Sequence, residues 1–301
     1  MFRKKLNSGR VVIIGSGGQL GQALMAQAPH SIGLTREQLD LSKPNVDEAL
    51  SSLLEPLGPI SGVINAAAYT AVDRAESEVD LAMCVNGEAP GQIAAYCEKR
   101  NVPFVHISTD YVFSGQARTP YRLSEQTSPI NSYGHSKLAG EVAIRKTNAA
   151  FVIMRTSWVF DGINSNFLTT MLRLAETRPS LSVVADQIGR PTYTLDLARA
   201  ALHALQRISY DKSKGGIYHV SNSGRPTSWE AFARSIFEAS DLDVKVVPIS
   251  TIDYPTPAKR PAYSVLDISD FEECFEFTMP CWQDALARAL KARGDNSRTK
   301  K

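Results

Sequence analysis

Two polar residues in the middle of the sequence have the types and spacing needed for proton transfer. Tyr133 and Lys137 are four residues apart in a segment whose helical pattern continues toward Asn148, so both side chains are expected on one face of a helix. An ammonium group beside a phenol favours the phenolate and lowers the phenol pKa from about 10, by about 1–3 units at close range. We therefore expect Tyr133 to have a lowered pKa and to donate a proton to an alkoxide that forms near neutral pH.

A second polar segment, residues 107–113, follows an apolar run that reads as a strand. Ser108 and Thr109 would lie at the carboxyl end of that strand, the edge at which parallel sheets bind ligands. Thr109 is predicted to add a hydrogen bond to the oxygen that Tyr133 protonates. A Tyr/Lys pair at this spacing is by itself typical of an ordinary helix surface. Its combination with this strand end favours a reaction site.

A glycine-rich segment, residues 15–21, lies between the first apolar run and a helical pattern. Gly15, Gly18 and Gly21 allow a tight turn, close approach of a pyrophosphate and close packing of helix on strand. The first N–H groups of the helix and its dipole favour phosphate binding. Its position after the first strand of a βαβ series favours a dinucleotide site over a simple tight loop.

The residues that follow the second predicted strand distinguish between cofactors. An acidic residue there would hydrogen-bond a ribose 2′-hydroxyl, whereas this chain has Thr35 and Arg36. A guanidinium suits bidentate contact with a 2′-phosphate. We predict NADPH as the cofactor. NADH stays open, with Arg36 as a solvated surface charge, because the strand boundary is uncertain by several residues.

Short apolar runs alternate with helical patterns through the first half of the chain, which predicts a doubly wound α/β fold with a Rossmann-type parallel sheet. The expected strands are residues 11–14, 32–34, 62–65, 104–108 and 151–155. After about residue 155 the pattern loosens, with helices expected at 166–177, 195–207 and 229–239 and strands at 181–184, 217–220 and 245–247. We predict a cofactor domain over residues 1–155 and a smaller C-terminal α/β domain over residues 156–301. Some later segments should return to the main sheet, and the polar tail, residues 291–301, should fray.

Composition excludes several classes of protein. The 301 residues carry 33 Lys and Arg against 31 Asp and Glu, a net charge of +2, which argues against nucleic-acid and membrane partners. The four cysteines have no metal-like spacing and are expected as free thiols. The apolar run near the N-terminus is shorter than the ~7–15 residues of a signal-peptide core, and no run reaches the ~18 residues of a membrane span. We expect a cytoplasmic protein.

Taken together, the glycine loop, residues 108–109 and the Tyr-x-x-x-Lys pair resemble the extended short-chain dehydrogenase/reductases. Within these, the chain is similar to the dTDP-4-dehydrorhamnose reductase family. The similarity rests on residues 18–21, 64–73, 108–113, 133–141, 155–158, 186–192 and 260–261. It covers nearly the whole chain, and the run Ile-Asn-Ala-Ala-Ala-Tyr-Thr-Ala-Val-Asp at 64–73 is its most specific element.

The resemblance implies a role for each matching residue. The catalytic group would be Thr109, Tyr133 and Lys137. The full set of predicted cofactor residues includes the glycine loop and Arg36, which are expected from the residues themselves. It consists of Gly15, Gly18, Gln19, Leu20, Gly21, Arg36, Asp40, Leu41, Ala66, Ala67, Ala68, Tyr69, Thr70, Tyr133 and Lys137. Residues 18–20 would meet the pyrophosphate, Asp40 and Leu41 the adenine side, and residues 68–70 the nicotinamide half. The substrate residues would be Val72, Thr109, Asp110 and Trp158, with Trp158 offering an aromatic face to the sugar unless it is simply packed.

The implied reaction is NADPH-dependent reduction of the C4 ketone of dTDP-4-dehydro-β-L-rhamnose to dTDP-L-rhamnose. The second half would then be mainly a domain for binding the sugar nucleotide. Two alternatives stay open: a nucleotide-sugar epimerase or dehydratase of the same superfamily, and a reductase-like regulatory subunit without catalysis. Tyr111 stands where similar dehydratases have Glu, which argues against the first.

Assembly and the remaining polar residues are less informative. A homodimer stays open. Some relatives bridge a dimer through metal-bound glutamates, but Ala23 stands at one such position, so no metal is expected. His106 is expected to be packed or on the surface. Trp229 and Trp282, each at a predicted helix start, are expected to anchor the core.

Overall fold

The centre of the computed structural model, which describes residues 9–298, is a six-stranded parallel sheet. Its strand order is β10-β5-β4-β3-β1-β2. The strands are β1 (Arg10–Ile14), β2 (Ile32–Leu34), β3 (Ile60–Asn65), β4 (Phe104–Thr109), β5 (Phe151–Thr156) and β10 (Gly216–His219). The predicted Rossmann-type fold class is confirmed.

Strand β1 shows why this sheet is covered on both faces. Its residues alternate in direction, with Val11 and Ile13 in one apolar cluster and Val12 and Ile14 in another. A strand with apolar residues on both sides must be covered on both sides, which explains the continuous apolar runs of the sequence.

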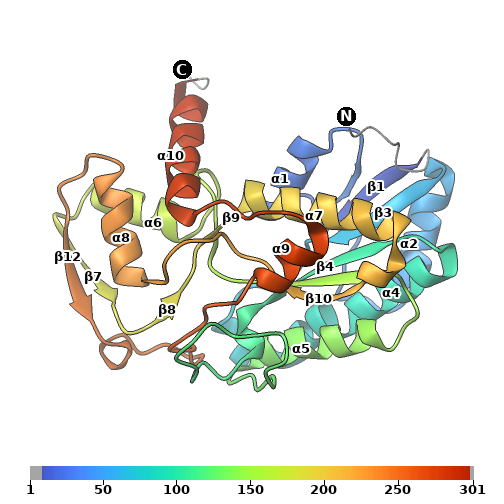
Figure 1. The fold of residues 1–301 in the computed structure, drawn as a ribbon, viewed down its shortest axis with the longest axis horizontal. Helices are drawn as coiled ribbons and strands as arrows, with labels where there is room; N and C mark the ends of the chain where they lie inside the picture. The colour runs from blue at the N-terminus through green and yellow to red at the C-terminus, as the bar shows by residue number, and fades with distance from the viewer. Residues whose placement is uncertain (1–8, 299–301) are drawn as a thin grey trace.

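Helices form one layer on each face of the sheet (Figure 1). The first layer contains α1 (Gln19–Gln27), α7 (Thr194–Tyr210) and α9 (Ser269–Phe275). The other contains α2 (Val46–Leu54), α4 (Ala89–Arg100) and α5 (Ser132–Arg145), with the short α3 (Val79–Met83) leading into a π-helical segment, Cys84–Glu88. The chain leaves β1 toward β2 and then crosses back to β3 on the other side of β1. This change of direction opens a crevice at the carboxyl ends of β1 and β3.

A smaller lobe lies beside the sheet (Figure 1). It packs α6 (Phe167–Ala175), α8 (Trp229–Glu238) and α10 (Trp282–Arg298) around a separate parallel pair, β7 (Ser180–Val184) and β12 (Lys245–Ile249). Two short pairs connect the lobe to the body: β6 (Val159–Phe160) with β9 (Thr192–Tyr193), and β8 (Ile188–Gly189) with β11 (Thr227–Ser228). Of the three strands expected in the second half, only 217–220 returns to the main sheet, as β10. The other two pair with each other, because the lobe has its own apolar cluster to bury.

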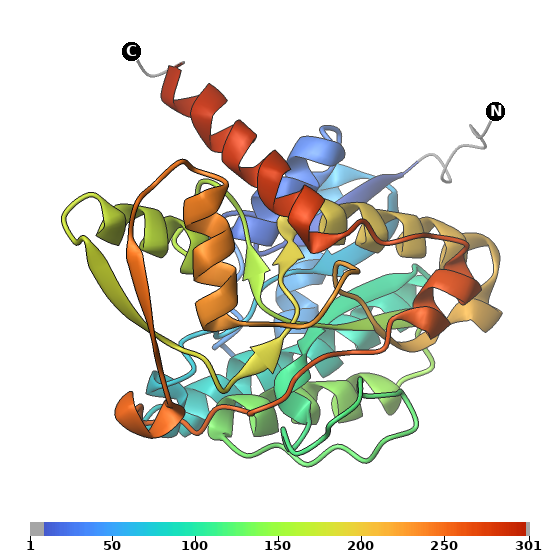
Figure 2. The same cartoon turned by 60° about the vertical axis from the view of Figure 1, so that its left-hand side comes forward.

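The expected frayed tail is wrong for most of its length. Helix α10 continues to Arg298 and projects from the body toward the C-terminus (Figure 2). Its first turns bury Ala285, Leu286 and Ala289 in the lobe, and an anchored helix extends into polar sequence at low cost. The remainder of the tail, residues 299–301, and the N-terminal segment, residues 1–8, lie outside the described residues.

The membrane and thiol expectations have simple structural counterparts. Between residues 9 and 298 no helix has the length and apolar character needed to cross a bilayer. All four cysteines are free thiols, as predicted.

Candidate active site

The carboxyl ends of the central strands open into a cleft of about 1120 Å³. That volume exceeds the ~1,000 Å³ upper range of typical single-ligand pockets and suits two ligands side by side. Every predicted site residue except Gly21 lines it. Gly21 lies inside α1, where a Cβ would come within 2.0 Å of the Gly15 carbonyl oxygen. Its role is therefore close packing of helix and loop, not ligand contact.

The glycine loop joins β1 to α1 at one end of the cleft. Gly15 has a φ of +80°, and a Cβ there would lie 2.6 Å from the backbone nitrogen of Ala67. Only glycine fits this position without strain. Helix α1 begins after Gly18 with no side-chain cap and no acidic residue in its first turn. Its first N–H groups therefore have no side-chain cap at a point where residues 18–20 line the cleft, an arrangement that suits an anion.

Arg36 and Asp40 lie beyond the end of β2, along the same side of the cleft. The Arg36 side chain is 75% exposed, and its Nε is 3.9 Å from Asp40 Oδ1. Hydrogen bonds from the Ser42 hydroxyl and backbone lower the pKa of Asp40, so this carboxylate is ionised at neutral pH. The Arg36 guanidinium is largely exposed and only loosely paired with Asp40, so it can also meet an anionic ligand.

The alanine-rich loop after β3 is held by Asn86, a buried residue of the π-helical segment. Asn86 accepts a hydrogen bond from the Tyr69 backbone N–H at 2.8 Å and donates to the Tyr69 carbonyl at 3.0 Å. It also donates to the Ser136 hydroxyl on α5 at 3.1 Å. Asn86 thus ties the alanine-rich loop to α5, the catalytic helix. π-Helical segments are frequent at functional sites, and this one supplies the residue that makes the connection.

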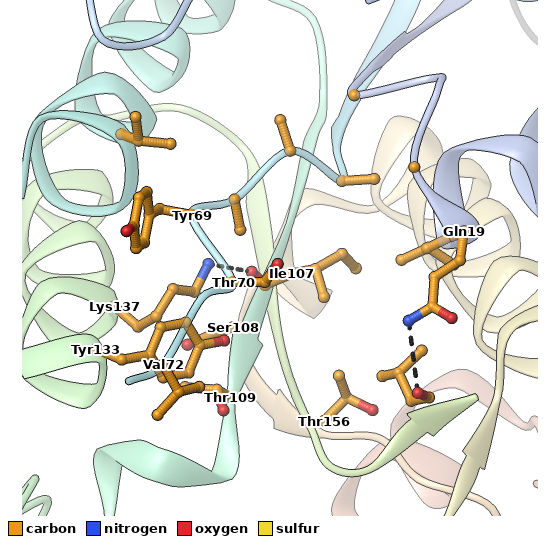
Figure 3. Close-up of a pocket in the computed structure, with 18 of the residues that line it drawn as sticks. Gln19, Tyr69, Thr70, Val72, Ile107, Ser108, Thr109, Tyr133, Lys137 and Thr156 are labelled. Carbon is orange, nitrogen blue, oxygen red and sulfur yellow. Dashed lines mark hydrogen bonds between the residues drawn. The ribbon is translucent and has the colours of Figure 1, made fainter. Parts of the chain in front are cut away.

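Thr109, Tyr133 and Lys137 converge on one side of the cleft, with Gln19 on the other and Thr156 between them (Figure 3). Tyr133 and Lys137 share a face of α5, as their spacing predicts. Burial raises the pKa of Tyr133 to about 12, and hydrogen bonding with the Thr109 hydroxyl only partly opposes this. The expected lowering of the Tyr133 pKa is therefore wrong for this structure.

The side chain of Lys137 explains that difference. It is 1% exposed, and Nζ donates to the Ile107 carbonyl at 2.6 Å (Figure 3). Nζ also lies 3.3 Å from His106 Nε2. Burial lowers the pKa of Lys137 to about 8, with Glu141 partly opposing. Since the Lys137 ammonium is drawn toward β4 and donates to Ile107, it does not offset the effect of burial on the Tyr133 pKa.

Asp110 adjoins the catalytic group in the 3₁₀ turn after β4. The Thr109 hydroxyl donates to Asp110 Oδ1 at 3.0 Å. Burial raises the pKa of Asp110 to about 6, with the Ser264 and Thr109 hydroxyls opposing. A weakly acidic carboxyl therefore lies directly beside the Thr109 hydroxyl.

Helix α5 is fixed at its start and in its middle. Asn131 caps it by accepting from the Gly134 N–H at 2.8 Å, and the Asn131 amide donates to the Lys259 carbonyl at 2.7 Å. One turn beyond Lys137, Glu141 forms a buried ion pair with Arg155 of β5. These contacts set the position of the Tyr133 and Lys137 side chains relative to the strand ends.

Trp158 lines the cleft, but its ring stacks on another tryptophan, whereas the resemblance implies an aromatic face offered to the sugar. It has a left-handed φ of +48°, and its ring stacks on Trp229 with centroids 3.5 Å apart and 7° between planes. A Cβ at Gly189 would lie 2.4 Å from the Trp158 ring, so the backbone of β8 also approaches the indole closely. Trp158 is thus clamped between β8 and the start of α8.

Trp229 meets its expected role only in part: it packs against the apolar cluster of the lobe, but it is only partly buried and also lines the cleft, with Phe167 at 4.6 Å on its ring. The first residue of an amphipathic helix can face either the core or a ligand, and its position in the chain did not distinguish these. Trp282 is buried in the lobe, as expected of a core anchor.

Other cleft residues were not singled out from the sequence. Thr156 ends β5 directly beside Thr109 in the sheet register, so the strand-end rule that found Thr109 could have found it too. Arg260 lines the cleft and pairs with Asp73 through two contacts of 2.8 and 2.9 Å. That pair fastens the C-terminal loop to the loop after β3. A separation of 187 positions along the chain hid this pair from sequence analysis.

A parallel Rossmann-type sheet with a glycine loop, a strand-end threonine and a helical Tyr-x-x-x-Lys pair at one cleft defines an oxidoreductase of the short-chain dehydrogenase/reductase class. Within that class, the family model described as "RmlD substrate binding domain" matches residues 9–294. The chain belongs to this family, the dTDP-4-dehydrorhamnose reductases, and the predicted family and enzyme class are confirmed.

Individual relatives match along almost their whole length. The dTDP-4-dehydrorhamnose reductase of Burkholderia thailandensis is 40% identical over 94% of this chain and 98% of its own. The spore coat polysaccharide biosynthesis protein SpsK of Bacillus subtilis is also 40% identical, with the same coverage. A crystal structure of dTDP-4-dehydrorhamnose reductase from Bacillus anthracis, in complex with NADP, has a TM-score of 0.86 and 35% identity, covering 94% of this chain and 99% of that one.

More distant structures share the fold alone. A UDP-glucose 4-epimerase from Brucella ovis, in complex with NAD, has a TM-score of 0.77 at 18% identity. Within residues 9–298, no group of three or more His, Cys, Asp and Glu side chains is arranged to hold a metal ion.

Proposed function

We propose that this protein uses NADPH to reduce the C4 ketone of dTDP-4-dehydro-β-L-rhamnose, giving dTDP-L-rhamnose. The observation that carries the proposal is the convergence of Thr109, Tyr133 and Lys137 at the cleft that the glycine loop also lines. Family membership and the relatives named dTDP-4-dehydrorhamnose reductase support the substrate class.

The cleft fits NADPH on three independent features. The Gly15 turn and the uncapped start of α1 suit a pyrophosphate, and the exposed Arg36 guanidinium suits a 2′-phosphate. Gln19 Oε1 and Thr156 Oγ1 are buried cleft atoms without a hydrogen-bond partner among the described residues. An acceptor at the glycine loop and a hydroxyl at the end of β5 suit polar groups of a bound dinucleotide. The complex of the Bacillus anthracis reductase with NADP supports the same cofactor.

When bound, NADPH supplies the hydride; the chain's own residues would supply the proton. With its pKa raised to about 12, Tyr133 is a phenol at neutral pH, which is the form that can donate. Its proton would go to the oxygen that becomes the C4 hydroxyl. Thr109 would hydrogen-bond that same oxygen and so orient the ketone. Lys137 would contact the cofactor and keep it in place beside Tyr133.

The sugar nucleotide would occupy the part of the cleft between the sheet and the smaller lobe. Val72, Asp110 and Trp158 line the cleft, as do Trp229 and Phe167 of the lobe, and we assign these five residues to the sugar nucleotide. On this assignment, residues 1–155 mainly hold NADPH and residues 156–301 mainly hold the sugar nucleotide. The aromatic rings give apolar walls that suit a deoxy sugar.

The test is NADPH oxidation by the purified protein with dTDP-4-dehydro-β-L-rhamnose, and NMR of the product. Tyr133→Phe should lower kcat by about 10²–10⁴-fold with an unchanged Kd for NADPH. Loss of NADPH absorbance that is equally fast in Tyr133→Phe would contradict the assigned proton donor. No oxidation by the wild-type protein, or one equivalent of tightly bound NAD after purification, would contradict the reductase assignment.

A further inference from the structure

Thr109 has a single hydroxyl hydrogen, and this structure directs it at Asp110. Thr109 Oγ1 donates to Asp110 Oδ1 at 3.0 Å and accepts from the Tyr111 backbone N–H at 3.2 Å. A hydroxyl has one hydrogen to donate and two lone pairs that accept. As long as Asp110 holds that hydrogen, Thr109 has none for the ketone oxygen that it would bind in the proposed reduction.

The same limit applies to Tyr133, whose hydroxyl hydrogen-bonds with the Thr109 hydroxyl. Because the Thr109 hydrogen is directed at Asp110, the phenol is the donor in that bond. An ionised carboxyl only accepts, so this order holds whenever Asp110 is a carboxylate. The hydrogens then run from Tyr133 to Thr109 and from Thr109 to Asp110, and neither is directed at a ketone.

A proton on Asp110 reverses this order without moving a heavy atom. A carboxylic acid has an O–H that can donate to Thr109 Oγ1 across the same 3.0 Å. The Thr109 oxygen then accepts from Asp110 and Tyr111, which leaves its own hydrogen and that of Tyr133 for the two lone pairs of the ketone oxygen. We propose that Asp110 is a positioning residue for Thr109: as an acid it directs both hydroxyl hydrogens to the ketone, and as a carboxylate it withholds them.

The surroundings of Asp110 favour a neutral acid more than water does. The residue is 3% exposed, and its Oδ2 is buried and accepts no hydrogen bond from the described residues. A buried charge with an unpartnered oxygen is costly. Burial accordingly raises the pKa of Asp110 to about 6, although the nearby Ser264 and Thr109 hydroxyls favour the charged form. Two phenols also face it, Tyr111 on its own turn and Tyr133 on α5, and both are neutral near pH 7.

The cations of neighbouring elements are committed to other partners. Arg260 of the C-terminal loop pairs with Asp73 at 2.8 Å, and Arg155 of β5 pairs with Glu141 at 2.6 Å. Lys137 on α5 donates to the backbone of β4. Among the described residues, burial and the nearby hydroxyl and backbone groups therefore set the charge of the Asp110 carboxyl.

The charge of Asp110 in the free protein gives the inference its sign. With a pKa of about 6, the carboxyl is mainly ionised at pH 7, and about a tenth of the protein carries the acid. The ketone selects that fraction, so kcat/KM, which reports the free protein, should fall about tenfold per pH unit above pH 6. It should level off about 10²-fold lower, the loss expected for one donor to a developing oxyanion. Asp110 keeps its proton throughout, since Tyr133 supplies the one that is transferred.

The pH profile of NADPH oxidation tests this between pH 6 and 8, below the Lys137 midpoint of about 8. Asp110→Asn offers Thr109 an amide NH₂ at every pH, so its profile should be flat in this range. Thr109→Val should be slow and flat, because it removes the hydroxyl through which Asp110 acts, and Thr109→Ser should restore both the rate and the fall. A flat wild-type profile, or the same fall in Asp110→Asn, would overturn the inference.

Glu76 provides a matched control carboxylate. It accepts from the Ser132 backbone N–H at 2.8 Å, at the start of the same helix, and does not line the cleft. Glu76→Gln should therefore keep the wild-type fall. A flat profile in this variant would assign the pH dependence to the anchoring of α5 and would contradict the role of Asp110.

A measurement without turnover separates this inference from the proposed function on which it rests. Carbon NMR of the Asp110 carboxyl, assigned with Asp110→Asn, gives its titration midpoint in the free protein and in the complex with NADP⁺ and dTDP-4-dehydro-β-L-rhamnose. NADP⁺ carries no hydride to transfer, so this complex does not react. The midpoint should rise by about one pH unit or more, because the ketone binds the acid form better. Binding with an unchanged or lower midpoint would overturn this inference alone, whereas a sugar nucleotide that does not bind would contradict the proposed function as well.

Discussion

Glu141 and Arg155 form a doubly hydrogen-bonded ion pair, 2.9 and 2.6 Å between atoms, with both side chains almost completely buried. Ser108 donates to the same carboxylate at 2.6 Å, and the guanidinium lies over the ring of Phe113. The pair joins α5 to β4 and β5 one turn beyond Lys137. It therefore holds α5 against β4 and β5 at a point one helical turn away from the reacting groups.

Glu141→Ala should lower the free energy of unfolding by about 3–5 kcal/mol, because it leaves the Arg155 charge buried without a partner. Urea unfolding of the purified variant would measure this loss. The double variant Glu141→Leu, Arg155→Met removes both charges and should recover much of it. Equal stabilities of the single variant and the wild type would show that the pair contributes nothing.

Lys137→Met should stabilise the protein at pH 7 while removing its proposed activity. The folded protein lowers the Lys137 pKa from 10.5 to about 8, so burying the ammonium has a cost that Met avoids. At ~1.4 kcal/mol per pKa unit, the full cost is about 3 kcal/mol. The variant also loses the hydrogen bond to Ile107, so its net gain in the free energy of unfolding should be about 1–3 kcal/mol.

The sign of the pH dependence gives a sharper check on the same lysine. Between pH 8 and 10.5 the unfolded chain binds a proton at Lys137 that the folded chain has released, so the stability of the wild type rises with pH there. The advantage of Lys137→Met should therefore be full below pH 8 and shrink as the pH approaches 10.5. An advantage that grows over this range would contradict the lowered pKa. Thermal unfolding at several pH values measures it.

Arg36→Ala should weaken NADPH binding by about 5–10-fold and leave NADH binding unchanged. The exposed guanidinium beside the end of β2 is only loosely paired with Asp40, and a charge-assisted contact to a phosphate is lost without it. Fluorescence titration with each cofactor would measure both constants. Arg118→Ala, which removes an exposed arginine that does not line the cleft, is the matched control. Equal weakening for NADPH and NADH would place Arg36 away from the 2′-phosphate.

Trp229→Ala should raise the KM for the sugar nucleotide several-fold, because Trp158 loses the ring that it stacks on. The Kd for NADPH should stay unchanged, since Trp229 lies on the lobe side of the cleft. Trp229→Phe keeps an aromatic face and should restore most of the affinity. A KM that does not change in a folded Trp229→Ala protein would remove Trp229 and its stack from substrate binding.

Several features of the site could be predicted from the sequence because they depend on the geometry of residues that are close together in the chain. The four-residue spacing of Tyr133 and Lys137 places them on one helix face whatever surrounds the helix. Gly15 lies where a strand turns directly into a helix, and its left-handed φ of +80° is a local requirement of that turn. The alternation of β1 residues between two apolar clusters likewise follows from strand geometry and predicted a sheet covered on both faces.

The tertiary structure alone decided which distant groups meet and what state they are in. Trp229 became a wall of the cleft because β11 pairs with β8 and brings α8 against Trp158. Arg260 reached Asp73, and His106 reached Lys137, through contacts between separate elements. The Tyr133 pKa moved up instead of down because burial outweighed a lysine whose nitrogen turned toward β4. Spacing along a chain encodes periodicity and sterics, whereas desolvation and long-range pairing depend on the fully packed fold.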